Sequence, residues 1–136
     1  MKVLVKRLIK DDDLKNSVVS IAVDNDIKAG CILSAVGCVD KATIRLADGK
    51  TTMTYENRYE IVSLTGTIAD NGVHLHISLA DDNGNVIGGH LMEETVVNTT
   101  CELIIGDLSD DFIFHREYDE NTKYRELTFK TPSGGQ

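Results

Sequence analysis

Three of the four histidines of this chain fall within 17 residues, a spacing that can bring three metal-binding rings together. They are His74, His76 and His90, and a short turn sequence separates the second from the third. Neutral imidazoles bind zinc and similar transition metals through one ring nitrogen at about 2.0–2.1 Å, and three of them leave a coordination position open for water or a substrate. The spacing therefore predicts an open transition-metal site, with Zn²⁺ as the first choice of metal.

The apolar residues around the turn decide whether the histidines meet, because residues of one parity share a strand face. The row before the turn comprises Leu75, Ile77 and Leu79, and the row after it Ile87 and Leu91. Both rows line one buried face if the loop is Asp82-Asn83-Gly84 or has five residues, and His76 then lies opposite His90. A two-residue Asn83-Gly84 turn would separate the rows, so we reject it. His74 is expected within diagonal reach of His90.

Further residues are candidates for the surroundings of this site. The candidates for an outer shell or a ligand pocket are Arg58, Glu60, Gly88 and Gly89. The glycines leave room for a ligand or another backbone, while Glu60, Glu93 or Glu94 could supply a carboxylate or a general base, although each is also a typical solvated charge. The alternative for the whole cluster is a polar, solvated hairpin face. We favour a metal or ligand site because histidine is the commonest metal ligand and three clustered rings are costly once charged.

Composition indicates one globular domain and opposes a nucleic-acid partner. The 136 residues are 41% hydrophobic and 26% charged, with a formal net charge of −8. Non-specific DNA binding depends on lysine and arginine releasing counterions from phosphates, and the low aromatic content leaves no stacking surface for single strands. Lys2, Lys6 and Lys10 share one parity and could form a basic stripe, but a solvated strand face is the favoured interpretation.

Several classes of protein lose support from what the sequence lacks. Cys31, Cys38 and Cys101 are odd in number and contain no Cys-x-x-Cys spacing, which predicts buried free thiols. Charges interrupt the first apolar run and no stretch approaches 18 apolar residues, so we expect no signal peptide, no membrane partner and a cytoplasmic location. A phosphate-binding loop, a nucleophile elbow and a zinc-protease helix are also missing, which leaves enzymatic activity open and disfavoured.

The remaining pattern predicts an α+β fold. A strand is expected over 2–9, followed by a helix capped by Asp11 or Asp12 that buries Leu14 and Val18 and ends near Asn25. The predicted strands that follow are 31–36, 41–47, 51–55, 58–68, 73–80, 86–91 and 96–105. One helix against a mostly antiparallel sheet gives a single α+β domain.

The C-terminal part predicts a hairpin and a tail. Residues 112–118 and 123–129 flank Asp119-Glu120-Asn121-Thr122, and His115 within the first strand has no nearby partner in the sequence, so we give it a structural role. Residues 34–37 could form an anion nest, but a tight turn is the plainer explanation. The domain is therefore placed at 1–130 and a flexible tail at 131–136.

Several segments resemble the plants and prokaryotes conserved (PPC) domain family. They are 57–68, 74–81, 88–91 and Ser34-Ala35-Val36-Gly37 with Ala42-Thr43 downstream, so the resemblance covers residues 2–130. It implies an α+β domain that forms homotrimers. In plants the domain follows an AT-hook that contacts the DNA minor groove, and bacterial members are labelled predicted DNA-binding proteins with a PD1-like motif by that kinship.

Two departures from the plant pattern shape the functional hypotheses. The sequence has no Arg-Gly-Arg-Pro AT-hook, and its histidines stand where the plant domains generally lack them, which matches the bacterial stand-alone type. The first hypothesis is a trimer whose three histidines bind a metal and leave a position for water or a small ligand. The second is a DNA-binding or transcription-associated regulator, opposed by the charge and the missing AT-hook. The third is a metal-dependent hydrolase or lyase with Glu60 as base, for which no substrate is indicated.

Overall fold

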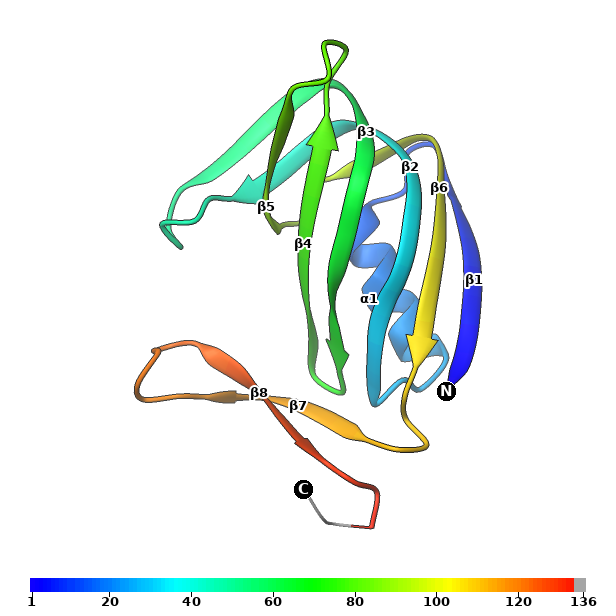
Figure 1. The fold of residues 1–136 in the computed structure, drawn as a ribbon, viewed down its shortest axis with the longest axis vertical. Coiled ribbons are helices and arrows are strands. Elements are labelled where there is room, and N and C mark those ends of the chain that lie inside the picture. The colour runs from blue at the N-terminus through cyan, green and yellow to red at the C-terminus, as the bar shows by residue number, and fades with distance from the viewer. Residues whose placement is uncertain (134–136) are drawn as a thin grey trace.

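The structure, a computed structural model, describes residues 1–133 and consists of a helix, a large curved sheet and a separate hairpin (Figure 1). The elements are β1 (Lys2–Ile9), α1 (Leu14–Asp24), β2 (Ala29–Arg45), β3 (Thr52–Ala69), β4 (Gly72–Ala80), β5 (Val86–Leu91), β6 (Val96–Asp107), β7 (Ile113–Tyr118) and β8 (Arg125–Lys130). The predicted strand positions are confirmed to within a few residues. The predicted tail 131–136 lies partly outside the described residues.

Helix α1 begins one or two residues later than the two caps suggested by the sequence would place it. Its N-cap is Asp13, whose Oδ1 accepts the backbone N–H of Asn16 at 2.9 Å, so the prediction of Asp11 or Asp12 as the cap is wrong. Asp12 instead accepts a backbone N–H from the end of β1, and Asp11 has a φ of 76°. The helix buries Leu14, Val18, Ile21 and Ala22, as its 3.6-residue periodicity requires.

The sheet has the order β1-β6-β2-β3-β4-β5, with every neighbouring pair antiparallel. β2 and β3 are 17 and 18 residues long, so each covers two strands that were predicted as separate from the sequence. The turn or anion nest predicted at 34–37 is not formed, because these residues continue β2. A register shift after Val39 lets β2 bend, and Ile44 and Arg45 then pair with Leu91 and His90 of β5. This bend brings the end of β2 beside the predicted site.

The core lies between α1 and the inner face of the sheet (Figure 1). Its largest fully buried side chains include Leu14, Ile44, Ile68, Leu75, Leu79, Leu91, Leu103 and Ile105. Cys101 belongs to this core, and burial raises the pKa of its thiol to about 11. Cys31 and Cys38 are only half-buried, so the prediction of buried thiols holds for one cysteine of the three.

The outer face of the sheet exposes apolar side chains. In β1 the row formed by Val3, Val5 and Ile9 points outward, while Leu8 on the other parity reaches the core. Further exposed apolar residues on this face are Leu33 and Val36 of β2 and Val62 of β3. Exposed apolar surface of this extent is typical of a protein contact surface.

The C-terminal hairpin formed by β7 and β8 is held to the turn between β3 and β4 (Figure 1). The Phe114 carbonyl accepts the backbone N–H of Asp70 at 2.9 Å, and the Nδ1 atom of His115 lies 2.7 Å from the Asp70 carboxylate. His115 thus has a partner 45 residues away in the sequence. Within residues 1–133 no helix combines the length and apolarity needed to span a bilayer.

Candidate metal centre

The three histidines meet on the outer face of the β4–β5 hairpin. His76 lies directly opposite His90, and the ring centroids of His74 and His90 are 5.3 Å apart. Leu75, on the alternate parity, is buried on the inner face. The loop is the predicted three-residue one: Gly84 has a φ of 80°, and its N–H donates to the Asp81 carbonyl at 3.0 Å. The register derived from the apolar rows is therefore confirmed.

The ring nitrogens lie close enough together to fit one metal ion. One nitrogen from each ring falls within 4.8 Å of the other two, and the Nε2 atoms of His74 and His76 are 3.1 Å apart. Two nitrogens bound to one zinc are at most about 4.2 Å apart, because each bond is about 2.1 Å long. Small ring rotations would close the widest pair. The buried Nδ1 atom of His90 has no hydrogen-bond partner, so this ring has an unused nitrogen in a buried position.

The glycines before His90 serve the packing of backbones. A Cβ atom on Gly88 would lie 2.4 Å from the Ile77 carbonyl oxygen, and one on Gly89 would lie 2.7 Å from the Arg45 carbonyl oxygen. β5 can therefore approach both β4 and the end of β2 only without side chains at these two positions. The sequence predicted that these glycines leave room for a ligand or for another backbone. In the structure, another backbone occupies this room.

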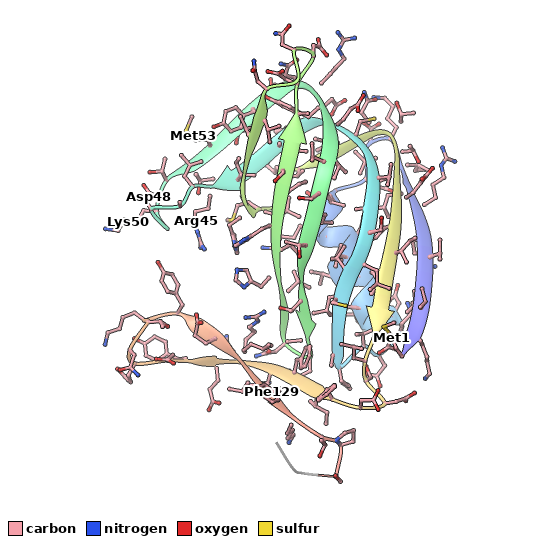
Figure 2. The ribbon with its side chains drawn as sticks, viewed as in Figure 1. Met1, Arg45, Asp48, Lys50, Met53 and Phe129 are labelled. Atoms are coloured by element: carbon pink, nitrogen blue, oxygen red, sulfur yellow. The ribbon has the colours of Figure 1, made fainter. Side chains whose placement is uncertain are left out.

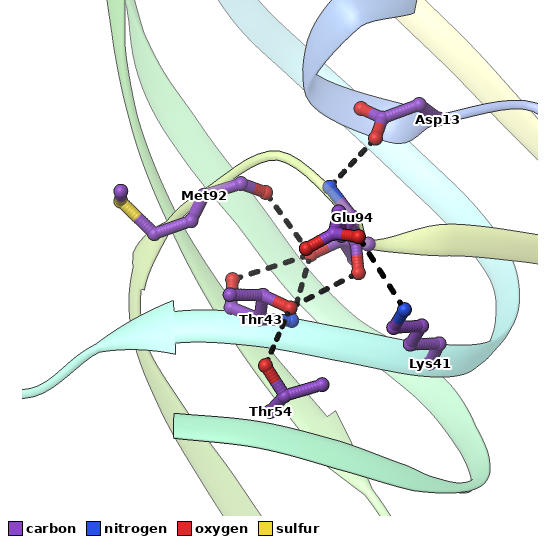
Figure 3. A network of polar contacts seen from close by, with 7 residues as sticks. Asp13, Lys41, Thr43, Thr54, Met92 and Glu94 are labelled. Carbon is purple, nitrogen blue, oxygen red and sulfur yellow. Dashed lines mark hydrogen bonds and ion pairs between the residues drawn. The ribbon is translucent and has the colours of Figure 1, made fainter. Parts of the chain in front are cut away.

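A buried polar network fixes the chain just after His90 (Figure 3). The Thr95 hydroxyl accepts the N–H of Thr43 at 3.1 Å and donates to the Met92 carbonyl at 3.1 Å. The Thr43 carbonyl in turn accepts the Met92 N–H at 3.0 Å. Asp13 accepts the backbone N–H of Glu94 at 2.7 Å. These bonds tie the β5–β6 connection to β2 and to the start of α1, and so they hold the end of β5 in place.

The electrostatic surroundings favour the neutral form of His74 and His90. Burial, followed by the charge of Arg45, lowers the pKa of His90 from its ordinary value of 6.5 to about 4. Burial and then Arg116 lower the pKa of His74. Only the neutral ring offers a lone pair to a metal, so these two rings are in the ligating form at neutral pH.

The cluster opens onto a cavity of about 400 Å³ between the sheet and the C-terminal hairpin. His74 and His90 line this cavity together with Arg45, Arg116 and Arg125, whereas His76 and His74 line a smaller cavity of about 130 Å³. Sequence reasoning missed these arginines, because β2 and the hairpin lie far from the histidines along the chain. The one signal in the sequence was the alternation of residues along β2, which indicates the sheet face on which Arg45 lies.

The carboxylates proposed for the surroundings of the site lie elsewhere in the chain. Glu60 pairs with Ala80, four residues along β4 from His76, which corresponds to about 13 Å. Arg58 binds Asp82 at 2.8 Å and, with Glu60, lines a different cavity. Glu94 pairs with Lys41 at 3.6 Å, and Glu93 is an exposed residue. Glu60 therefore lies too far away to act as a base on the cluster of the same chain.

Fold and site together define an α+β protein with a three-histidine cluster on the outer face of a curved sheet. Residues 1–109 match the Plants and Prokaryotes Conserved (PCC) domain, the family introduced above as PPC. The chain belongs to this family. The match confirms the resemblance found in the sequence, and it ends before the C-terminal hairpin.

Relatives of known description carry the domain within longer chains. The chain is 37% identical over 134 residues to a bifunctional protein GlmU of Synechococcus sp. (strain JA-2-3B'a(2-13)), which covers 98% of this chain and 21% of that protein. It is 29% identical over 116 residues to AT-hook motif nuclear-localized protein 10 of Arabidopsis thaliana, covering 79% of this chain and 33% of that protein. The chain thus spans about a fifth to a third of the length of these relatives.

Solved structures confirm the predicted fold class. A hypothetical protein from Salmonella cholerae-suis aligns with a TM-score of 0.92 at 28% identity, over 96% of this chain and 94% of that one. A protein from Archaeoglobus fulgidus, described as metal-containing, aligns with a TM-score of 0.71 at 26% identity, over 94% of each chain. A protein described as metal-containing therefore shares the fold of this chain.

Proposed function

We propose that this chain binds one transition-metal ion, with Zn²⁺ as the first choice, through His74, His76 and His90. The observation that carries the proposal is the meeting of three ring nitrogens within 4.8 Å on one sheet face. Three imidazoles of zero charge leave one tetrahedral position for water or a small ligand, and that position would face the cavity beside the histidines. The metal-containing relative from Archaeoglobus fulgidus supports the proposal.

Elemental analysis of protein purified without chelator tests this directly. We expect about one metal ion per chain, and His76→Ala is expected to weaken binding by more than about 100-fold, since even outer partners of a ligand contribute 10–100-fold. His115→Ala is the matched control, because this fourth histidine binds Asp70 away from the cluster. The absence of metal from the wild-type protein after reconstitution, or equal loss in both variants, would refute the proposal.

We further propose that the protein acts as a homotrimer, as the family resemblance implies. The support in this chain is the exposed apolar row of β1 together with Leu33, Val36 and Val62 on the same sheet face. The free edge of β1 is a second surface that an assembly would cover. A trimer has closed symmetry, so it buries such a face without leaving an open end.

Binding to duplex DNA is the second candidate function, favoured by the AT-hook description of the Arabidopsis relative. The net charge of −8 opposes it, and the lysine stripe is partly neutralised, since Lys2 lies 3.8 Å from Asp110 and Lys10 lies 3.7 Å from Asp40. Titration with duplex DNA at low salt tests it. Affinity that falls steeply as salt rises would support the DNA role, and no binding at low salt would exclude it.

A further inference from the structure

The cavity beside the histidines has cationic walls. Its volume of about 400 Å³ lies within the range of small-molecule sites. Its lining residues include three arginines, Arg45, Arg116 and Arg125, and one acidic residue, Glu126. Such a surplus of positive charge is unexpected in a chain of net charge −8, so it calls for a specific explanation.

The three arginines lack carboxylate partners among residues 1–133. None of them takes part in any of the ion pairs found within 4.0 Å. Arg116 donates to the Thr67 hydroxyl, and Arg125 donates to the Arg116 carbonyl at 3.1 Å. The Nε atoms of Arg45 and Arg116 are buried without any hydrogen-bond partner. A guanidinium can only donate, so an acceptor that enters the cavity, a ligand oxygen or a water, would satisfy these buried N–H groups.

The arginines are held in place by elements far apart in the sequence. Arg45 ends β2 directly opposite His90, and Figure 2 shows it at the margin of the sheet that faces the hairpin. Arg116 is fixed through its backbone, whose N–H donates to Asn71 Oδ1 at 2.7 Å and whose carbonyl accepts from Asn71 Nδ2 at 2.9 Å. The backbone at Arg45 and Arg116 is therefore fixed by the fold, and the Arg116 side chain is also held by its bond to Thr67.

We propose that this cavity binds a small organic oxyanion, a carboxylate or a phosphate, held by Arg45, Arg116 and Arg125 with one oxygen directed at the metal position. Guanidinium groups match both anions through paired N–H donors. A divalent ion bound by three neutral imidazoles beside three arginines and one glutamate leaves a large positive excess, which an anionic ligand offsets. The part concerning the metal position rests on the proposed function, whereas the arginine contacts do not.

NMR titration of the protein with one equivalent of Zn²⁺ per chain tests the proposal through the Nε–H signals of Arg45 and Arg116. Malonate and inorganic phosphate are the probes, and sodium chloride at equal ionic strength is the reference. We expect saturable shifts of these signals with either probe, and at least about tenfold weaker binding in Arg45→Gln and Arg116→Gln, the loss typical of one charge-assisted hydrogen bond. Arg58→Gln, which removes an arginine paired with Asp82, should bind like the wild-type protein.

The outcomes separate this proposal from that of metal binding. Identical shifts with chloride, or unchanged affinity in both cavity variants, would overturn the anion site even if the protein holds stoichiometric metal. Saturable binding that persists in metal-free His76→Ala would uphold the arginine site. In that case, metal analysis of the wild-type protein decides the proposed function separately. Tighter binding of malonate would identify a carboxylic acid as the ligand class, and tighter binding of phosphate a phosphate ester.

Discussion

His90 combines the strongest constraints of any residue in the cluster. It lies opposite both His76 on β4 and Arg45 on β2, so two strands fix its position. Its Nδ1 atom is buried without a partner, and burial with the charge of Arg45 lowers its pKa to about 4. A ring held neutral in this way is prepared for a metal, but it makes the metal-free fold sensitive to acid.

We expect the metal-free protein to lose about 1 kcal/mol of unfolding free energy through His90 between pH 7 and pH 5, less than the full pKa shift corresponds to because the ring is partly solvated. The folded pKa is about 4 and the unfolded value 6.5, so in this interval only the unfolded chain takes up the proton. The contribution is complete above pH 6.5 and is lost as the pH falls toward 4.

Urea unfolding of wild-type protein and His90→Gln at both pH values measures this effect. The variant keeps a polar side chain without the titrating ring, so its loss on acidification should be smaller by about the same 1 kcal/mol. Equal losses in the two proteins would show that His90 does not carry the pH dependence.

At the level of elements, the C-terminal hairpin depends on the β3–β4 turn. Two-stranded hairpins are marginally stable by themselves, so β7 and β8 need contacts with the main sheet. Asn71 supplies two hydrogen bonds to the backbone of Arg116, and Asp70 supplies one backbone bond and the contact with His115. The Phe114 N–H also donates to the Lys28 carbonyl at 2.9 Å, and Arg116 donates to Thr67, so the hairpin is held by a small number of hydrogen bonds in which Asn71 supplies two.

Asn71→Ala is expected to loosen the hairpin while the main sheet stays folded, because it removes two bonds worth about 1 kcal/mol each. Hydrogen–deuterium exchange over residues 113–130 should become markedly faster, with little change in β2 or β6. Asn83→Ala, in the exposed β4–β5 loop, is the control. Unchanged exchange in the hairpin of the Asn71 variant would show that other contacts hold it.

At the scale of the whole molecule, the sheet has two apolar faces, whereas residues 1–133 contain one helix to cover them. α1 covers the inner face, and the outer face keeps Val3, Val5, Val36 and Val62 exposed. The histidine cluster lies on this same outer face, at the β4–β5 end. An assembly built on this face would therefore bring a second subunit toward the metal position.

Val62→Asp is expected to convert the proposed trimer to monomer, because a charge buried at an apolar contact without a partner costs several kcal/mol. Light scattering coupled to size exclusion measures the mass, and circular dichroism checks that the monomer is folded. Val86→Asp, equally exposed but at the tip of β5, should remain trimeric. A wild-type mass of one chain would reject the trimer without affecting the metal proposal.

The sequence alone was sufficient for the hairpin that carries the histidines. The apolar rows and Gly84 admitted one register, because a shift by one residue would have turned Leu75 or Leu91 outward. Local rules of this kind also predicted α1 and most of the strands. These local rules did not identify Asp13 as the N-cap of α1. Each of the three consecutive aspartates can cap a helix, and the path of the chain into the helix decides among them.

Only the tertiary structure decided what surrounds the histidines. The bend of β2 that places Arg45 opposite His90 arises from a register shift, and the position of Arg116 depends on Asn71, 45 residues earlier in the chain. Local periodicity contains no information about either, because both depend on how distant elements pack. The histidines were therefore predictable from short-range pattern, whereas the cationic cavity required the complete fold.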